Sequence, residues 1–421
     1  MRASDRTDCP APGRFPRIAA AGAAFQGGAA AVDSATVMAS LVHLLTGSAL
    51  AVGYASAVLR LGWLLPQMVV GYLADRAERR MPFYIFGAFG RAAALALIAG
   101  LLWWCSDWPP VPLALGFLGL WTVYAFVSGV VAVPYNDIVG RTIPSERRSR
   151  MLAWRFFGGG LLGLAVAAVL RIALDLLPPL EAFALIFAVG SALMLISSFL
   201  FVSAGEPAPP PKRQAPQRRG SVVAFLREGL DTVRRDPAFR QFLIFQWLGS
   251  ATLMALPFYV VAASGQGLDA AAVGTLLAAQ TTGSLVSNPL WGRLGDRAGK
   301  LRLLEVVAVM RIAAPLLVLV LIATGVGIAG FVVLFVLIGM MMNGVTIGFL
   351  GFLMEISPDD RRSAYSSWFN TFAAPAALSP IVGAALVSII AIEAVFVLAA
   401  LAAIAQIGVL SQMGRSMRIA R

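Results

Sequence analysis

Two stretches of the chain repeat one pattern: residues 71–80 read Gly-Tyr-Leu-Ala-Asp-Arg-Ala-Glu-Arg-Arg, and residues 292–300 read Gly-Arg-Leu-Gly-Asp-Arg-Ala-Gly-Lys. Their glycine, leucine, aspartate and first arginine stand at the same spacing. A second pair, residues 144–149 and 358–363, reads Pro-Ser-Glu-Arg-Arg-Ser and Pro-Asp-Asp-Arg-Arg-Ser. Because both pairs are separated by about 220 residues, they indicate a duplicated structural unit.

The sequence around these stretches is mostly apolar. Of the 421 residues, 59% are hydrophobic and 13% are charged, whereas a soluble domain carries about a quarter charged residues. This composition excludes a soluble enzyme, a disordered scaffold and a secreted disulfide-rich domain. A helix needs about 20 apolar residues to cross a bilayer. The sequence therefore predicts twelve membrane-spanning helices, at residues 18–45, 50–72, 82–104, 111–135, 151–173, 181–203, 238–263, 270–291, 303–323, 329–352, 363–387 and 391–412.

The expected fold is an all-α polytopic membrane protein whose twelve transmembrane helices form two six-helix bundles. Both copies of each repeated loop follow equivalent spans, so the two bundles are parallel repeats. The linker between them opens rich in proline and then forms a basic amphipathic helix, which we expect on the membrane surface. The predicted parts are an N-terminal tail at 1–17, a first bundle at 18–203, the linker at 204–237, a second bundle at 238–412 and a C-terminal tail at 413–421.

The net charge of +12 is distributed unevenly along the chain. All but five of the 33 Lys and Arg residues lie in the tails, the linker and the loops on one side of the predicted spans. The loops on the other side carry only acidic charges, at Asp107, Asp175, Glu181 and Asp269. The positive-inside rule then places both termini in the cytoplasm of a bacterial cell, with the spans in its inner membrane. Nucleic acid is not needed as a partner to explain the charge.

The repeated loop resembles the hallmark loop of the major facilitator superfamily, G-x-L-a-D-R/K-x-G-R-R/K. The residues that carry the resemblance are Gly71, Leu73, Asp75, Arg76, Arg79 and Arg80 in the first copy, and Gly292, Leu294, Asp296 and Arg297 in the second. Glu78 departs from the family pattern, which usually has glycine there. The run Pro134-Tyr135-Asn136 is also similar to the glycoside–pentoside–hexuronide branch of that superfamily. The resemblance implies a transporter with the superfamily fold.

The charges of the two loops suggest a gate at the cytoplasmic side. Gly71 permits a close approach of two helices, and Asp75 suits a helix N-terminus. The loop arginines, Arg76 and Arg80 among them, are expected to pair with Asp137. In the second copy, Gly292 takes the place of the first glycine, and Asp296 and Arg297 are expected to act together with Glu355. The alternative is that these charges only fix the topology.

Asp33 is the acidic residue nearest the middle of any predicted span, where an ionisable group is costly and is a functional candidate by default. Paired with a movable arginine, it would load and release a proton during transport. Arg60 and Arg91, well inside the second and third spans, are the candidate partners. The alternative is a structural Asp–Arg bridge. The excess of intramembrane arginines suits an anionic substrate, or equally arginines bonded to backbone carbonyls.

Polar side chains within the spans are candidates for binding a solute. The resemblance implies that spans one, four, seven and ten line a central cavity. The candidate substrate-binding residues are Gln26, Tyr124, Gln246, Gln280, Asn343 and Asn370. One histidine and two cysteines cannot form a nitrogen- or sulfur-rich metal site, and no phosphate-binding loop or nucleophile–base set occurs. No cofactor, metal or enzymatic activity is therefore expected.

These features favour a monomeric secondary transporter that moves a small-molecule substrate by alternating access in the lipid bilayer. A proton or another cation would be the coupling ion. An antiporter that exports drugs or metabolites is the first alternative. The second is a transporter-like sensor or assembly factor that carries no flux.

Overall fold

The computed structural model describes residues 13–207, 222–357 and 362–419, and the regular elements of these residues are all helical. The first group of helices is α1 Arg14–Ala30, α2 Val37–Thr46, α3 Ala49–Arg76, α4 Met81–Trp104, α5 Pro110–Thr142, α6 Ser145–Leu176 and α7 Pro179–Ala204. The second is α8 Val222–Arg235, α9 Pro237–Ala255, α10 Phe258–Gly265, α11 Ala272–Arg297, α12 Lys300–Thr324, α13 Ile328–Ile356, α14 Arg362–Ala373, the 3₁₀ helix η1 Ala374–Leu378, α15 Ser379–Ile389 and α16 Ile392–Ile419.

The helices confirm an all-α membrane protein. Ten helical stretches within the described residues are long and apolar enough to cross a membrane. Each of the twelve predicted spans falls on helix, but the first and the eighth are not among those ten. The eighth is α11, which is long enough but too polar, with three consecutive polar residues at 280–282. Most of the predicted N-terminal tail and the proline-rich part of the linker lie outside the described residues.

The first predicted span is two helices rather than one. α1 ends at Ala30 and α2 begins at Val37, with turns between them. The side chain of Asp33 causes the break, because its Oδ1 accepts bonds from the N–H groups of Ala35 and Thr36, both at 3.0 Å. Those amides lie in the turn that precedes α2, and a carboxylate that bonds amides two and three residues further on favours a turn over a continuing helix.

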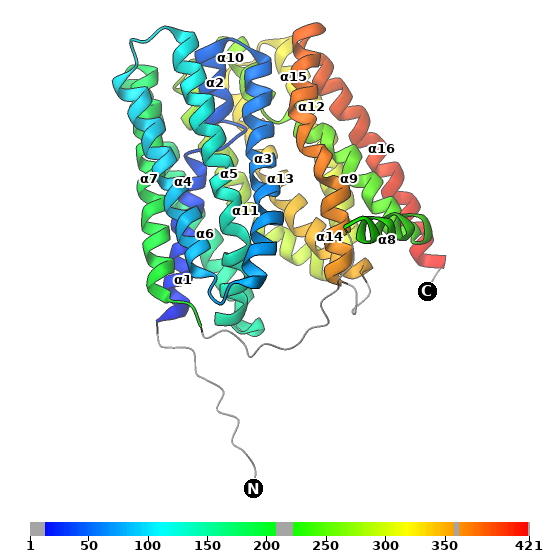
Figure 1. The fold of residues 1–421 in the computed structure, drawn as a ribbon. Helices are drawn as coiled ribbons and strands as arrows, with labels where there is room; N and C mark the ends of the chain where they lie inside the picture. Colours follow the sequence, from blue (N-terminus) through cyan, green and yellow to red (C-terminus); the bar gives the residue numbers. More distant parts are fainter. Residues whose placement is uncertain (1–12, 208–221, 358–361, 420–421) are drawn as a thin grey trace.

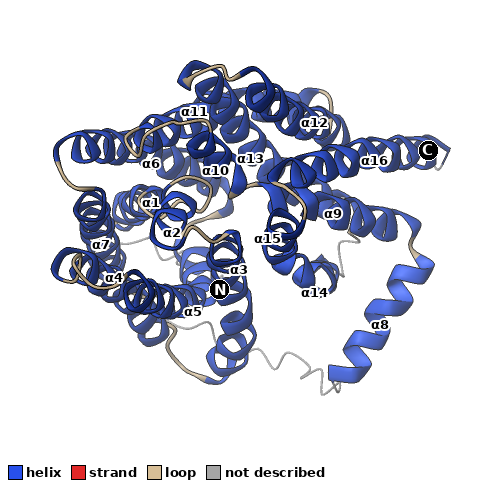
Figure 2. Ribbon diagram, turned by 90° about the horizontal axis from the view of Figure 1, so that it is seen from above, coloured by secondary structure: helices blue, strands red, loops and turns tan. Residues whose placement is uncertain are grey.

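Two spans of the second half are also interrupted. Pro257 separates α9 from α10, because proline has no N–H to donate into a continuing helix. The span that starts with α14 passes through the short 3₁₀ helix η1 before α15, with Pro375 and Pro380 at the two junctions. In the view along the helices, α10 and α15, which follow the two interruptions, lie toward the middle of the molecule (Figure 2).

The helices form two groups that lie side by side in Figure 1. In the first, α1 packs on α6 and α7, and α4 packs on α5 and α7. In the second, α11 packs on α13, and α16 packs on α9 and α12. Four clusters of buried apolar side chains fill the described part of the chain, and the largest includes residues from both groups.

The two groups pack together at the end of the molecule away from the termini. There α3 contacts α15, α6 contacts α11, and α2 contacts α10 (Figure 1). Two glycines permit the closest approaches: a Cβ on Gly53 would lie 2.5 Å from the carbonyl oxygen of Pro380, and one on Gly274 would lie 2.6 Å from the backbone nitrogen of Arg171. This end is therefore closed by direct backbone-to-backbone packing.

Helix α8 lies roughly at right angles to the spans (Figure 1) and outside the ring that they form in the view along them (Figure 2). It packs on α14, because Trp368 Nε1 donates to the carbonyl oxygen of Phe225 at 3.0 Å and the two rings lie 5.6 Å apart. Gly229 faces the same indole at a distance where a Cβ would clash. Its predicted contact with the membrane surface remains a prediction.

Candidate functional site: cavities between the helix groups

Asp33 lies at the break between α1 and α2 and is held by four hydrogen bonds. Its Oδ1 accepts from the N–H groups of Ala35 and Thr36 at 3.0 Å each and from Thr36 Oγ1 at 2.9 Å. Its Oδ2 accepts from Gln280 Nε2 at 3.0 Å. Because Gln280 belongs to α11, this last bond joins the two helix groups near the middle of the spans.

Asp33 and Gln280 line a cavity of about 320 Å³ between the groups, with walls from α1, α6, α11 and α13. Three of the predicted substrate-binding residues lie on this cavity, namely Gln26, Gln280 and Asn343. Asn343 Nδ2 also donates to Asn288 Oδ1 at 2.7 Å, which joins α13 to α11. The cavity has little charge but several amides, an arrangement that suits hydrogen bonding to a polar solute.

A second cavity of about 390 Å³ also lies between the two groups, with α3 of the first group as one wall. The predicted residues Arg60, Gln246 and Asn370 lie on it, and its far wall is η1. η1 is the 3₁₀ helix at the interruption between α14 and α15, and it places small alanine side chains against α3.

The structure does not bring the three predicted coupling residues together. Asp33 lines the first cavity, Arg60 the second, and Arg91 a separate pocket inside the first helix group. No ion pair to Asp33 occurs in the described part of the chain; its partner is the Gln280 amide instead. The sequence could not show this, because span numbering says nothing about the rotation of each helix about its axis.

Tyr124, the sixth predicted substrate-binding residue, lies away from these two cavities. It is 5% exposed and stacks on Trp121 with ring centroids 4.9 Å apart, within the first helix group. Trp121 Nε1 in turn donates to the carbonyl oxygen of Ala55 at 2.9 Å. This face of α5 thus packs against α3, and its aromatic residues belong to the core.

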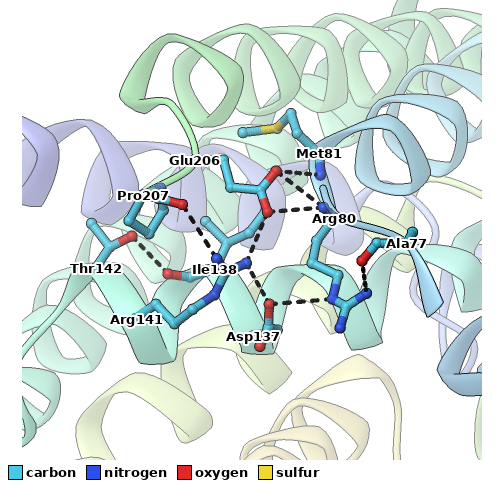
Figure 3. A network of polar contacts seen from close by, with 9 residues as sticks. All are labelled: Ala77, Arg80, Met81, Asp137, Ile138, Arg141, Thr142, Glu206 and Pro207. Carbon is cyan, nitrogen blue, oxygen red and sulfur yellow. Dashed lines mark hydrogen bonds and ion pairs between the residues drawn. The ribbon is translucent and has the colours of Figure 1, made fainter. Parts of the chain in front are cut away.

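The first loop network lies inside one helix group (Figure 3). Arg80 Nε approaches Asp137 Oδ2 at 3.6 Å, and Arg141 Nη2 pairs with the same oxygen at 2.5 Å. Arg141 Nη2 also lies 2.8 Å from Glu206 Oε1. These pairs connect the start of α4, the end of α5 and the segment after α7. The predicted pairing of Arg80 with Asp137 is present, but its described contacts hold one group together and do not cross to the other.

Glu206 completes this network, and the sequence analysis did not identify it. Its carboxylate accepts from the N–H groups of Arg80 at 2.8 Å and Met81 at 2.9 Å, at the beginning of α4. Burial opposes its ionisation, but the Arg80 N–H, the Arg141 guanidinium and the Met81 N–H together outweigh burial and lower the pKa of Glu206 from its ordinary value of 4.5. The available signal was an acid directly after an apolar span on the basic side.

Four other residues of the two repeated loops belong to the predicted gate: Gly71, Asp75, Arg76 and Gly292. The side chains of Asp75 and Arg76 lie outside the described residues. A Cβ on Gly71 or Gly292 would meet nothing within 4 Å, so neither glycine is at a close helix approach here. The expected close approach at Gly71 is therefore wrong for this conformation.

The second loop differs from the expectation. Asp296 lies 3.4 Å from Lys300, one turn further along, and its side chain is 81% exposed. Arg297 and Glu355 are both exposed, and no ion pair joins them among the described residues. Solvated side chains of this kind gain little from pairing, which explains why the expected partners are apart.

Comparison with known families agrees with this architecture. The model of the Major Facilitator Superfamily matches residues 18–373 and, in a second match, residues 256–410. The chain belongs to the major facilitator superfamily. Among curated proteins, no sequence matches this member of the superfamily.

Several solved transporter structures share the fold of this superfamily member. The nucleoside transporter NupG superposes with a TM-score of 0.67 at 14% identity, over 96% of this chain and 98% of that one. A POT family transporter in complex with 5-aminolevulinic acid superposes with a TM-score of 0.67 at 11% identity, over 94% of each chain. A bacterial homologue of the iron transporter ferroportin, in an outward-facing state, superposes with a TM-score of 0.61 at 15% identity, over 95% of this chain and 99% of that one. At these identities the likeness concerns the fold alone.

Proposed function

We propose that this chain is a proton-coupled secondary transporter of a small solute, with Asp33 as its proton site. Membership of the superfamily makes it a membrane transporter rather than an enzyme. The observation that carries the proton site is the hydrogen bond between Asp33 and Gln280, because it lies in a cavity and joins the two helix groups.

The geometry of Asp33 gives its two oxygens different roles. Oδ1 already accepts three hydrogen bonds, so a proton would bind at Oδ2. The protonated Oδ2 would then donate to Gln280, whose Oε1 is buried and has no partner within the described residues. Rotation of the Gln280 amide group would therefore present its NH₂ group to ionised Asp33 and its oxygen to protonated Asp33.

Electrostatics supplies the driving force for this proton exchange. An ionised carboxylate removed from water costs several kcal/mol unless it is well paired. The partners of Asp33 are neutral groups rather than a cation. Closure of the cavity around the ionised form would therefore be unfavourable, and proton uptake would remove that penalty. This coupling of charge to closure is what a proton-driven transporter requires.

We also propose an orientation and a conformational state. The basic loops, both termini and α8 lie at one end of the molecule, which we assign to the cytoplasm by the positive-inside rule. The opposite end is closed by the packing at Gly53 and Gly274. Both cavities extend from the level of Asp33 toward residues such as Asn288 and Phe349, nearer the basic end. The conformation is thus open toward the cytoplasm.

Transport by proteoliposomes tests the proposal. Wild-type protein would be offered labelled nucleosides, dipeptides, hexoses and organic acids, with and without an imposed pH gradient. We expect one class to accumulate only with the gradient. The sign of the gradient that drives accumulation separates uptake from export by an antiporter.

The Asp33→Asn variant should lose gradient-driven accumulation while it still exchanges labelled for unlabelled solute. Asp175→Asn is the matched control, since Asp175 is half exposed and pairs with Arg171 at the closed end. Accumulation by Asp33→Asn equal to that of wild type would show that the proton site is elsewhere.

A further inference from the structure

A pocket of about 120 Å³ lies inside the first helix group, apart from the Asp33 cavity. Helices α1, α3, α4, α5, α6 and α7 all contribute to its wall. Its charged residues are Arg91 from α4 and Arg155 from α6. Aromatic rings surround both guanidinium groups, and none of the described residues that line it is acidic.

The two arginines are incompletely paired. Arg91 is 3% exposed, and no hydrogen bond or ion pair to its guanidinium occurs in the described structure. Arg155 Nη1 donates to Tyr135 Oη at 2.9 Å, but its Nε is buried without a partner. Buried polar atoms in native proteins are nearly always bonded, so unpaired Nε donors on buried Arg91 and half-buried Arg155 point to a missing acceptor.

Both guanidinium groups also lie against the same aromatic ring. The guanidinium carbons of Arg91 and Arg155 lie 4.5 Å and 5.4 Å from the centre of the same Phe25 ring. The ring attracts both cations but cannot neutralise them. Two like charges in a medium of low dielectric repel each other, so an anion bound in the pocket that both arginines line would offset the repulsion and supply an acceptor to the unpaired donors.

Size and lining restrict the anion. The volume is several times the roughly 10–15 Å³ that a single water molecule needs on the same measure, enough for a carboxylate with a short carbon chain. Ala21, Val131 and Trp63 supply apolar surface beside the arginines. Trp63 also lines the second cavity between the groups, together with Arg60 one turn earlier on α3. Trp63 therefore lies between this pocket and the second cavity.

We infer that Arg91 and Arg155 bind the carboxylate of a small organic acid, with Phe25 and Trp63 against its carbon chain. Guanidinium groups match carboxylates in shape and charge, which favours this class over neutral solutes. If the proposed transport function holds, an organic acid is the solute class; the binding site itself does not depend on Asp33.

Equilibrium binding to purified protein in detergent tests the site without any gradient. Propionate, its neutral counterpart propionamide, chloride and inorganic phosphate are the probes, followed by calorimetry and by the thermal unfolding temperature. We expect propionate to bind and to raise the unfolding temperature, with no effect of propionamide. Binding of chloride or phosphate without propionate would contradict the organic-acid assignment, and binding of none would remove the site.

Variants locate the binding. Arg91→Gln and Arg155→Gln should each weaken propionate binding about 10- to 100-fold, the loss expected for a charge-assisted hydrogen bond. Arg311→Gln is the matched control, because Arg311 is an intramembrane arginine of the second group and bonds to Gln406. Equal weakening in all three variants would contradict the site.

A further readout separates this role from a structural one. In anion-free buffer Arg91→Met should unfold at a temperature equal to or above that of wild type, because it removes an uncompensated buried charge. With saturating propionate, wild type should instead unfold at a higher temperature than Arg91→Met. A structural arginine would lose stability in both buffers. Asp33→Asn should bind propionate normally, so failure of proton coupling and failure of this site give different results.

Discussion

The close approach of α11 to α6 makes the closed end of the molecule sensitive to one methyl group. A Cβ on Gly274 would lie 2.6 Å from the nitrogen of Arg171, 2.7 Å from its Cα and 2.8 Å from its Cβ. These are backbone and near-backbone atoms, so no flexible side-chain end can move aside. The substitution Gly274→Ala should therefore force α6 and α11 apart.

The magnitude follows from packing energetics. To reach ordinary contact the helices must separate by roughly 0.5–1 Å, and overpacking of this kind costs about 1–3 kcal/mol. The gain in helix propensity from alanine applies to both conformations and cancels. Since 1.4 kcal/mol is a factor of ten, the equilibrium should shift about 5- to 150-fold away from the conformation closed at this end.

Distance measurements between spin labels read this equilibrium directly. Labels on cysteines that replace Gly140 in α5 and Ser411 in α16 report the separation at the basic end, in a background with Cys9→Ser and Cys105→Ser. We expect Gly274→Ala to enlarge the population with the shorter separation. Gly265→Ala is the control, because a Cβ there meets nothing within 4 Å. If the two variants give the same distance distribution, backbone packing does not set the closed end.

Three other predictions concern stability. Glu206→Gln should lower the free energy of unfolding by about 1–3 kcal/mol at neutral pH. The pKa of Glu206 is lowered in the folded state, so the stability that its carboxylate contributes is complete above its unfolded pKa of 4.5 and is lost as the pH falls through the folded pKa. The unfolding free energies of wild type and variant, measured by chemical unfolding across that pH range, should therefore become equal at the acid end. Gln406→Leu should lower the free energy of unfolding by about 1–3 kcal/mol, because it removes both the acceptor 3.0 Å from buried Arg311 and the bond to the Phe245 carbonyl. Gln406→Glu keeps an acceptor for Arg311 and should lose less stability in the same unfolding assay. Gly229→Leu should detach α8 from Trp368, and faster proteolysis within α8 than in wild type would report it, whereas an unchanged rate would contradict the contact.

Much of the fold was predictable because membrane helices are specified by long apolar runs. The repeated loops and the positions of the twelve spans needed no tertiary information. The break at Asp33 was not predicted, since a span of 28 residues at 18–45 gave no sign that the Asp33 carboxylate would bond the amides of Ala35 and Thr36 in a turn. The interruption at η1 depends on packing against α3 as well as on its prolines.

The site was predictable only at the level of individual residues. Intramembrane polarity identified Asp33, and five of the six predicted substrate-binding residues do lie on the two cavities, because such groups rarely face lipid. It could not choose Gln280 over an arginine as the partner of Asp33, because that choice depends on how α11 is rotated. Tyr124 had the same polarity as the others, but its ring stacks within the core.

The central claim is that Asp33 exchanges a proton in contact with Gln280. Infrared difference spectra recorded during a pH titration of purified protein measure this directly, through the stretching band of a protonated carboxyl group. The account predicts one component of this band that grows as the pH is lowered, is missing from Asp33→Asn while the components of the other carboxyl groups remain, and shifts in Gln280→Leu, where the amide partner is removed. The same component in Asp33→Asn, or one that Gln280→Leu leaves unchanged, would contradict it.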